Sequence, residues 1–126
     1  MDEKYAVALE PVLRDLAATC AVQPVVREET HHGTDWVMFY EPEGSGVGIG
    51  PLIGDNYPEQ VACLADKAQE WAVEALWATG EPAVWPLCPN HPNAHPLTAG
   101  VSRGVAVWSC PKTHTTVASI GQLSAT

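Results

Sequence analysis

Basic residues are scarce in this chain of 126 residues, which carries six Lys and Arg against fifteen Asp and Glu, for a net charge of −9. Residues 1–80 hold fourteen of the acidic residues and four of the basic ones, a balance of −10, whereas residues 81–126 balance at +1. Nucleic-acid affinity depends mainly on Lys and Arg side chains that neutralise phosphates. Plain nucleic-acid binding is therefore disfavoured, and we expect a protein partner instead.

Long apolar runs are also lacking. The first twenty residues include Asp2, Glu3, Glu10, Arg14 and Asp15, which interrupt the apolar core that a secretory signal peptide needs. No later stretch reaches the roughly twenty apolar residues that span a membrane. Since hydrophobic residues make up 46% of the sequence and charged ones 17%, we expect a folded chain in the cytoplasm with no membrane partner.

Only four cysteines are present, and a reducing cytoplasm disfavours pairing them in disulfides. Cys20 and Cys63 stand among apolar residues, which predicts that both are small side chains of the core. Cys88 and Cys110 differ, because each is followed by Pro and has His residues close behind it. These two cysteines are the ones that suggest chemistry.

Residues 1–80 predict a helix followed by three strands. Apolar residues recur at helical spacing over residues 9–18, and Pro11 indicates that this helix begins near Glu10 or is kinked there. An antiparallel meander is predicted from three β-favouring segments that are separated by glycine-containing breaks, namely residues 23–29, 35–41 and 47–53.

A long amphipathic helix is predicted next. Asn56 is a suitable N-cap, Pro58 suits the first turn, and Glu59 completes a capping box, while Gly80 and Pro82 end the helix. The acidic side chains lie opposite a single apolar stripe. The stripe consists of Val61, Leu64, Ala65, Ala68, Trp71, Ala72, Ala75 and Leu76.

This element order predicts an α+β fold, and it is also the order of double-stranded-RNA-binding domains. Those domains hold RNA with basic residues, however, and the second helix offers Lys67 among a row of acids. The shared order of elements therefore indicates a similar arrangement of helices and strands, and it does not indicate RNA binding.

Residues 81–126 have a different composition, which is rich in Pro, His and Cys. Residues 104–109 and 115–123 predict two strands of a β-hairpin. A segment this small needs a staple or a host domain, so we expect a zinc-ribbon-like unit packed on the long helix through Trp77 and Trp85. The predicted organisation is thus an α-β-β-β-α domain at 1–80 and a metal-binding segment at 81–126.

Two turns, each with a proline after its cysteine, suggest that a bound metal ion stabilises this segment. Cys88 and His91 enclose two residues, Cys110 and His114 enclose three, and eighteen residues separate His91 from Cys110. Structural zinc sites take four Cys or His ligands, usually in pairs from tight turns of this length. Sulfur together with imidazole favours Zn²⁺ over Mg²⁺ or Ca²⁺. We therefore predict one structural zinc ion.

The spacing leaves the ligand set open. His95 lies four residues beyond His91, so His95 and His114 compete for the fourth position, and the other would be a hydrogen-bond partner of a ligand or a surface residue. An interpretation without a metal, as a buried thiol pair with ordinary loop histidines, stands beside this one.

A resemblance bears on that choice. The segments PAVWPLCPNHPNAHPL and GVAVWSCPKTHTTVASIGQL, with QEWAVEALWATG before them, resemble a recurring group of small uncharacterised proteins from high-GC Gram-positive bacteria. The resemblance covers about the last half of the chain. It implies that Cys88, His91, His95 and Cys110 belong to the site more firmly than His114, and it implies no activity.

No catalytic grouping is evident from the sequence. Serine, histidine and acidic residues do not stand at the spacing of a known triad, and the zinc-deaminase signature is missing. His31 and His32 are expected in a polar hairpin turn. The predicted role is a protein-interaction adaptor or regulatory subunit that is not an enzyme and has no small-molecule substrate. The alternatives are a zinc-dependent hydrolase, with Glu81 or Asp55 as base, and a nucleic-acid module confined to residues 81–126.

Overall fold

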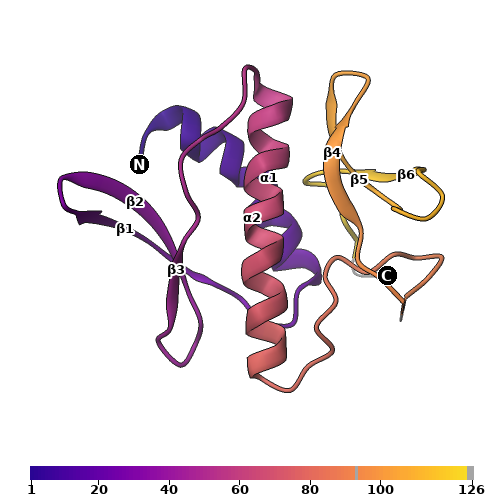
Figure 1. Ribbon diagram of the computed structural model, residues 1–126, viewed down its shortest axis with the longest axis horizontal. Coiled ribbons are helices and arrows are strands. Elements are labelled where there is room, and N and C mark those ends of the chain that lie inside the picture. Colours follow the sequence, from indigo (N-terminus) through magenta and orange to yellow (C-terminus); the bar gives the residue numbers. More distant parts are fainter. Residues whose placement is uncertain (93, 125–126) are drawn as a thin grey trace.

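A computed structural model describes residues 1–92 and 94–124 and has an α+β fold (Figure 1). Two helices, α1 (Glu3–Thr19) and α2 (Tyr57–Ala78), lie between two three-stranded antiparallel sheets. One sheet has the order β1-β2-β3, and the other has the order β4-β5-β6. The predicted α+β class is therefore confirmed, whereas the zinc-ribbon-like arrangement of residues 81–126 stays a prediction. Within the described residues, no helix combines the length and the apolarity that a membrane crossing requires.

The first helix starts earlier than predicted. Helix α1 begins at Glu3 and continues through Pro11, although Pro11 cannot donate a hydrogen bond to the carbonyl of Val7, one turn before it. The hydroxyl of Tyr57 compensates by donating to the Val7 carbonyl oxygen at 3.4 Å. Pro11 is itself buried beside Gly121, where an added Cβ would lie 2.8 Å from the Pro11 ring. A tertiary contact thus keeps a proline inside the helix.

The first sheet is a meander, as expected. Strands β1 (Val25–His31) and β2 (Thr34–Tyr40) are joined by the two-residue turn His32–Gly33, and both turn residues have positive φ. Strand β3 (Gly46–Gly48) is shorter than the predicted segment 47–53. It ends early because Gly50 has a φ of 91° and Pro51 has no amide hydrogen for a ladder.

Helix α2 matches its prediction closely. Asn56 Oδ1 accepts a hydrogen bond from the Glu59 backbone amide at 3.0 Å, and the eight residues of the predicted apolar stripe are the buried residues of this helix. Thr79 is the C-cap, and Gly80 follows with a φ of 79°.

The second sheet corrects the predicted hairpin. It contains three strands, β4 (Thr98–Ser102), β5 (Val105–Ser109) and β6 (Thr116–Ser119). β4 was not predicted, because its turn to β5 is Arg103–Gly104, in which a non-glycine residue has a φ of 52°. Two-residue hairpin turns with positive φ at both positions are usually recognised in a sequence by Asn or Asp at the first position, where this chain has Arg103. Strand β6 ends at Ser119, before a turn at Gly121 with a φ of 104°.

One buried cluster joins both halves of the chain. It contains Leu9 and Leu16 of α1, Phe39 of β2 and the α2 stripe, and also Trp85, Cys88, Leu97, Trp108 and Cys110. The boundary at residue 80 stays a prediction. Of the two tryptophans expected to pack the C-terminal segment on α2, Trp85 is buried, whereas Trp77 is 77% exposed, so that part of the prediction is wrong.

Asp15 is the one buried charged residue among the described residues. Its Oδ2 accepts hydrogen bonds from Trp108 Nε1 at 2.8 Å and from the Gly121 amide at 2.7 Å. Its Oδ1 accepts a third bond from the Leu123 amide at 3.0 Å. A single carboxylate of α1 thereby fastens β5 and the turn that follows β6.

Candidate metal centre

The loop of residues 86–97 carries the first three candidate ligands. Its two ends are joined by a hydrogen bond from the Leu97 amide to the Pro86 carbonyl at 2.9 Å. Inside the loop, the His91 amide donates to the Cys88 carbonyl at 3.0 Å, which closes the tight turn that the sequence predicted. Cys88 is fully buried at the base of this turn, and His91 and His95 are half-buried.

The fourth candidate, Cys110, follows β5 and is also fully buried. The Cys110 amide donates to the Thr115 carbonyl at 2.9 Å, and the His114 amide donates to the Cys110 carbonyl at 2.8 Å. The Thr113 hydroxyl hydrogen-bonds the Cys110 thiol and, with the backbone amides of Thr113 and Lys112 and with Cys88, lowers the Cys110 pKa to about 6 despite its burial. These donors favour the thiolate, which is the form that binds metals.

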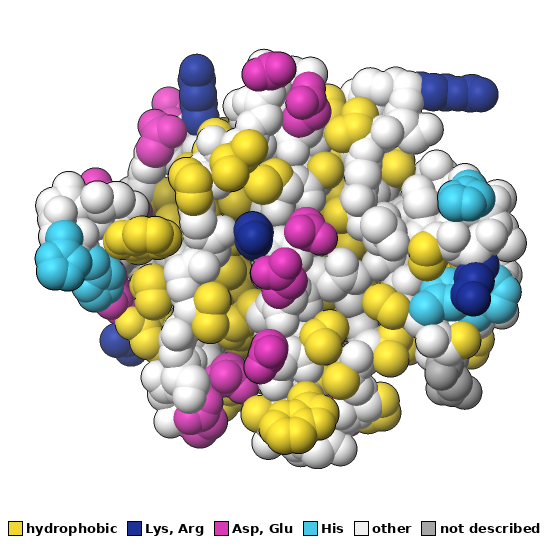
Figure 2. Space-filling model, in the orientation of Figure 1, with side chains coloured by type: hydrophobic (Ala, Val, Ile, Leu, Met, Phe, Trp, Pro, Cys, Tyr) yellow, Lys and Arg dark blue, Asp and Glu magenta, His cyan; other side chains and the backbone are white. Residues whose placement is uncertain are grey.

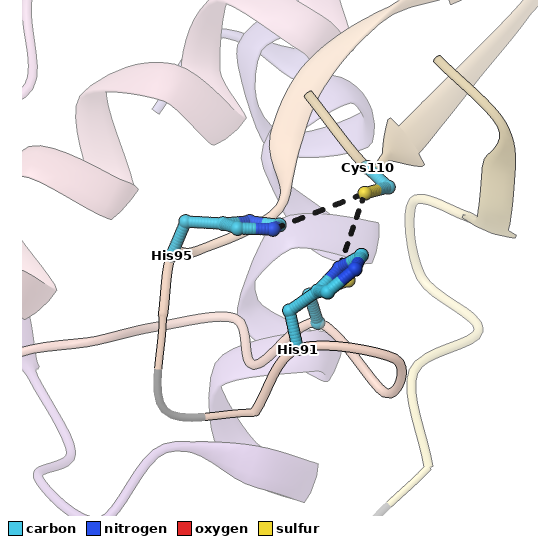
Figure 3. A group of neighbouring side chains, drawn as sticks. His91, His95 and Cys110 are labelled. Carbon is cyan, nitrogen blue, oxygen red and sulfur yellow. Dashed lines mark hydrogen bonds between the residues drawn. The ribbon is translucent and has the colours of Figure 1, made fainter. Parts of the chain in front are cut away.

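Four of the five predicted ligands converge on one point. One ligand atom from each of Cys88, His91, His95 and Cys110 can be chosen so that all lie within 4.8 Å of one another. His91 Nδ1 lies 3.5 Å from Cys88 Sγ and 3.6 Å from Cys110 Sγ. His95 Nε2 lies 3.9 Å from Cys110 Sγ, and Figure 3 shows both imidazole rings pointing toward this sulfur atom. The group could therefore hold a metal ion.

Hydrogen bonding indicates which nitrogen of His95 is available. His95 Nδ1 lies 3.1 Å from the Pro96 carbonyl oxygen, which can only accept a hydrogen bond. Nδ1 therefore carries the proton, and Nε2 is left with a lone pair toward the sulfur atoms. Histidine ligands of metal ions commonly have their second nitrogen held in this way.

The distances can be tested against a tetrahedral zinc site. Zn–S bonds of about 2.3 Å and Zn–N bonds of about 2.05 Å at tetrahedral angles place sulfur and nitrogen about 3.6 Å apart. The three S···N distances here are 3.5, 3.6 and 3.9 Å. The same geometry places two sulfur ligands about 3.8 Å apart and two nitrogen ligands about 3.3 Å apart. Since no pair of the four ligand atoms is more than 4.8 Å apart, a closure of at most about 1.5 Å reaches these separations. The residues fit a Cys2His2 centre.

His114 lies outside the group of four. It is exposed, and it adopts a φ of 59° at the end of the turn that begins at Cys110. Its backbone amide shapes that turn, as described above. His31 and His32 lie at the exposed β1–β2 turn, as expected, and His31 Nε2 is 3.0 Å from Glu29 Oε1.

Gln69 was not identified from the sequence as a residue of the site. Its Nε2 donates to the Leu97 carbonyl at 2.6 Å and to the Trp85 carbonyl at 3.1 Å, so one side chain of α2 holds both ends of the ligand loop. No local pattern could have revealed this role, because the two acceptors lie 16 and 28 residues further along the chain.

Two buried tryptophans, Trp85 and Trp108, pack against each other close to the two cysteines in the sequence. The rings of Trp85 and Trp108 meet edge to face, with centroids 5.5 Å apart, and Trp85 Nε1 donates to Thr19 Oγ1 at 2.9 Å. Trp85 precedes the Cys88 turn, and Trp108 precedes Cys110 by two residues. The packing of this pair therefore helps to fix the distance between the two cysteines before any ion binds.

Comparisons with known proteins found no matching family model, curated protein or solved structure.

Proposed function

We propose that this chain is a small acidic zinc-binding protein that acts as a protein-interaction adaptor or regulatory subunit, with the zinc ion serving a structural role. The observation that supports it most is the convergence of Cys88, His91, His95 and Cys110, whose ligand atoms lie within 4.8 Å of one another and include three S···N distances of 3.5, 3.6 and 3.9 Å. Four protein ligands close the coordination shell, which is typical of a structural site, whereas a catalytic zinc keeps a position for water.

Within this proposal, His95 is the fourth ligand and His114 is not. Support comes from the geometry of His95 Nε2 and from the bond that orients its ring. The centre resembles a zinc ribbon in taking ligands from two separate turns, one of them at a strand end. Thiolate ligands need a reducing compartment, for which the cytoplasm is our proposal.

The interaction role is supported by surface charge. Figure 2 shows Asp and Glu side chains along the middle of one face, over α2, where the few Lys and Arg side chains do not balance them. An acidic surface steers basic partners toward the molecule and repels phosphate backbones. A basic protein partner is the class that this field favours.

One observation favours a hydrolase instead. A cavity of about 550 Å³ adjoins Cys88 between the end of α1, the ligand loop and β6, and its volume suits a small ligand. A zinc hydrolase also needs a general base near the metal. Among the described residues lining this cavity, none is Asp, Glu or His, so the adaptor is the better-supported function.

The proposal is tested by the metal content of single-ligand variants. We expect one zinc per chain in the wild type and in His114→Ala, and loss of zinc in Cys88→Ser, Cys110→Ser and His95→Ala. Retention of zinc in His95→Ala with loss in His114→Ala would reverse the ligand assignment. A zinc-free wild type, purified under reducing conditions from zinc-supplemented cells, would reject the metal centre. Zinc-dependent ester or amide hydrolysis that is lost with the metal would reject the structural role.

A further inference from the structure

Trp77 is the most exposed large hydrophobic side chain of the described residues, at 77%. The tryptophans at 71, 85 and 108 are all buried, and Trp36 is 37% exposed. Trp77 lies in the last turn of α2, where Figure 2 shows hydrophobic side chains at the lower edge of the molecule. An exposed indole gains nothing from burial in the monomer, whereas tryptophan is a preferred anchor of protein interfaces.

The electrostatics of this helix end are unbalanced. The C-terminus of a helix carries partial negative charge, and cationic side chains in the last turn usually offset it. The last turn of α2 contains no basic residue. Glu74 precedes Trp77 by one turn, and Glu81 is held at the helix end because its amide donates to the Leu76 carbonyl at 2.9 Å. Two acidic residues, Glu74 and Glu81, thus lie within about one turn of Trp77 at the negative end of the helix.

Further carboxylates come from the turn between β2 and β3. The pKa of Glu41 is raised by partial burial and then by the charges of Glu43 and Glu74, so each of these two side chains lies close enough to Glu41 to repel it. Lys67 is not available to relieve this crowding, because its Nζ lies 3.8 Å from Glu70 on the preceding turns of α2. The negative potential at the end of α2 therefore has no cation of this chain to offset it among the described residues of the last turn.

We propose that the C-terminal end of α2, formed by Trp77 with Glu74 and Glu81, is the docking surface for an arginine-bearing segment of a protein partner. The proposal rests on the interaction role proposed above and specifies the chemistry of the partner. A guanidinium group stacks on the face of Trp77, and its N–H groups reach the flanking carboxylates.

Arginine fits this surface better than the other candidates. A lysine ammonium is a strongly hydrated point charge that pairs with carboxylates but cannot stack as a plane on an indole. An apolar segment would cover Trp77 but would leave the carboxylates desolvated and unpaired, which is costly. Nucleic acid would be repelled. A planar guanidinium cation can stack on the Trp77 ring and pair with the carboxylates of Glu74 and Glu81 at the same time.

The test is calorimetric titration of the zinc-loaded full-length protein with hexa-arginine and hexa-lysine peptides at low ionic strength. We expect hexa-arginine to bind more tightly than hexa-lysine. Trp77→Leu should weaken hexa-arginine binding about two- to fivefold, which is the loss of an exposed cation–π contact, and should leave hexa-lysine binding nearly unchanged. The matched control Trp36→Leu should alter neither. Glu74→Gln with Glu81→Gln should weaken both peptides.

Equal affinity for the two peptides, an unchanged hexa-arginine affinity in Trp77→Leu, or no binding by the wild type would each overturn the docking surface. Zinc content is measured in the same samples. A full zinc content alongside such a result rejects only this surface, whereas a zinc-free wild type rejects the function proposed above.

Discussion

At the scale of single residues, Asp15 shows how one buried carboxylate can organise distant segments. Its three donors come from β5 and from the chain after β6, more than ninety residues away in sequence. A buried donor that loses its acceptor costs its full desolvation penalty, so Asp15 is worth more to the fold than its own burial suggests. It also holds Trp108, two residues from the Cys110 ligand.

Replacing Asp15 with Ala is expected to destabilise the protein by about 3 kcal/mol or more, because two buried donors and a partly buried one lose their acceptor together. Urea unfolding of the zinc-loaded protein measures the effect. Asp66→Ala, at an exposed position of α2, should stay within about 0.5 kcal/mol of wild type. A similarly small effect for Asp15→Ala would show that water replaces the carboxylate.

Glu41 gives a second prediction at this scale. Its pKa is raised above 4.5 by partial burial, with Glu43 and Glu74 adding to the shift. The folded state therefore binds the proton more tightly than the unfolded state, and stability falls as the pH rises from 4.5 through the raised pKa. Glu41→Gln removes this loss.

We expect Glu41→Gln to have a higher free energy of unfolding than wild type at neutral pH, and the difference to vanish below pH 4.5. Denaturant unfolding at several pH values measures it, with Asp66→Asn as the exposed control. A destabilised Glu41→Gln at neutral pH would mean that the ionised carboxylate makes a favourable contact.

At the scale of elements, α2 is the support of the ligand loop. Gln69 bonds the carbonyls of Trp85 and Leu97, and with the Leu97–Pro86 bond it closes the loop at its base. A loop that is closed before metal binding loses less conformational entropy when the ligands gather. We therefore expect the helix to contribute to metal affinity without supplying a ligand.

Gln69→Ala is therefore expected to weaken zinc binding about tenfold or more, within the range seen when outer supports of metal ligands are removed. Competition with a chromophoric zinc chelator gives the affinity. Gln60→Ala is the matched control, because Gln60 lies on the same helix but bonds Gly54. Equal zinc affinities in the two variants would separate α2 from the metal centre.

Elements also show what sequence patterns can predict. The α2 stripe was predicted residue by residue, because apolar periodicity and the Asn56 cap are local signals. The start of α1 was missed, because the residue that compensates Pro11 is Tyr57, on another helix. Strand β4 was missed, because its turn uses Arg103 where Asn is usual. Each miss has a tertiary contact or an unusual turn as its cause.

The candidate site, too, was predictable from the sequence only in part. The spacing of Cys and His predicted two turns that meet, and four of the predicted side chains do come together. Spacing could not choose between His95 and His114, since both lie a short turn from another ligand. The difference arises from long-range geometry, namely where β5 places Cys110 relative to the loop of residues 86–97.

At the scale of the whole molecule, the candidate metal centre is part of the common core. Cys88 and Cys110 are members of the same buried cluster as the helices and Phe39. All four cysteines are free thiols, so no disulfide links the ligand loop to Cys110 at the end of β5. An ion at this point would join the loop to β5 and thereby to the core.

Removal of zinc is therefore expected to lower the stability of the entire molecule in one transition. Free zinc at a hundred times its dissociation constant should add about 2.7 kcal/mol relative to the metal-free protein. Thermal unfolding followed by circular dichroism, with and without chelator, measures this change. The double variant Cys88→Ser with Cys110→Ser should not respond to chelator. If chelator changes tryptophan fluorescence but leaves the thermal unfolding of the helices unchanged, the metal stabilises only its immediate surroundings, which would contradict this prediction.

The most direct test of the account is X-ray absorption spectroscopy at the zinc edge of the purified protein. We predict four ligands, two sulfur atoms at about 2.3 Å and two imidazole nitrogen atoms at about 2.05 Å, with no oxygen in the shell. The variant His114→Ala, which is expected to keep its zinc, should give the same spectrum. A wild-type shell that contains a water oxygen, or a single sulfur atom, would contradict the closed structural centre.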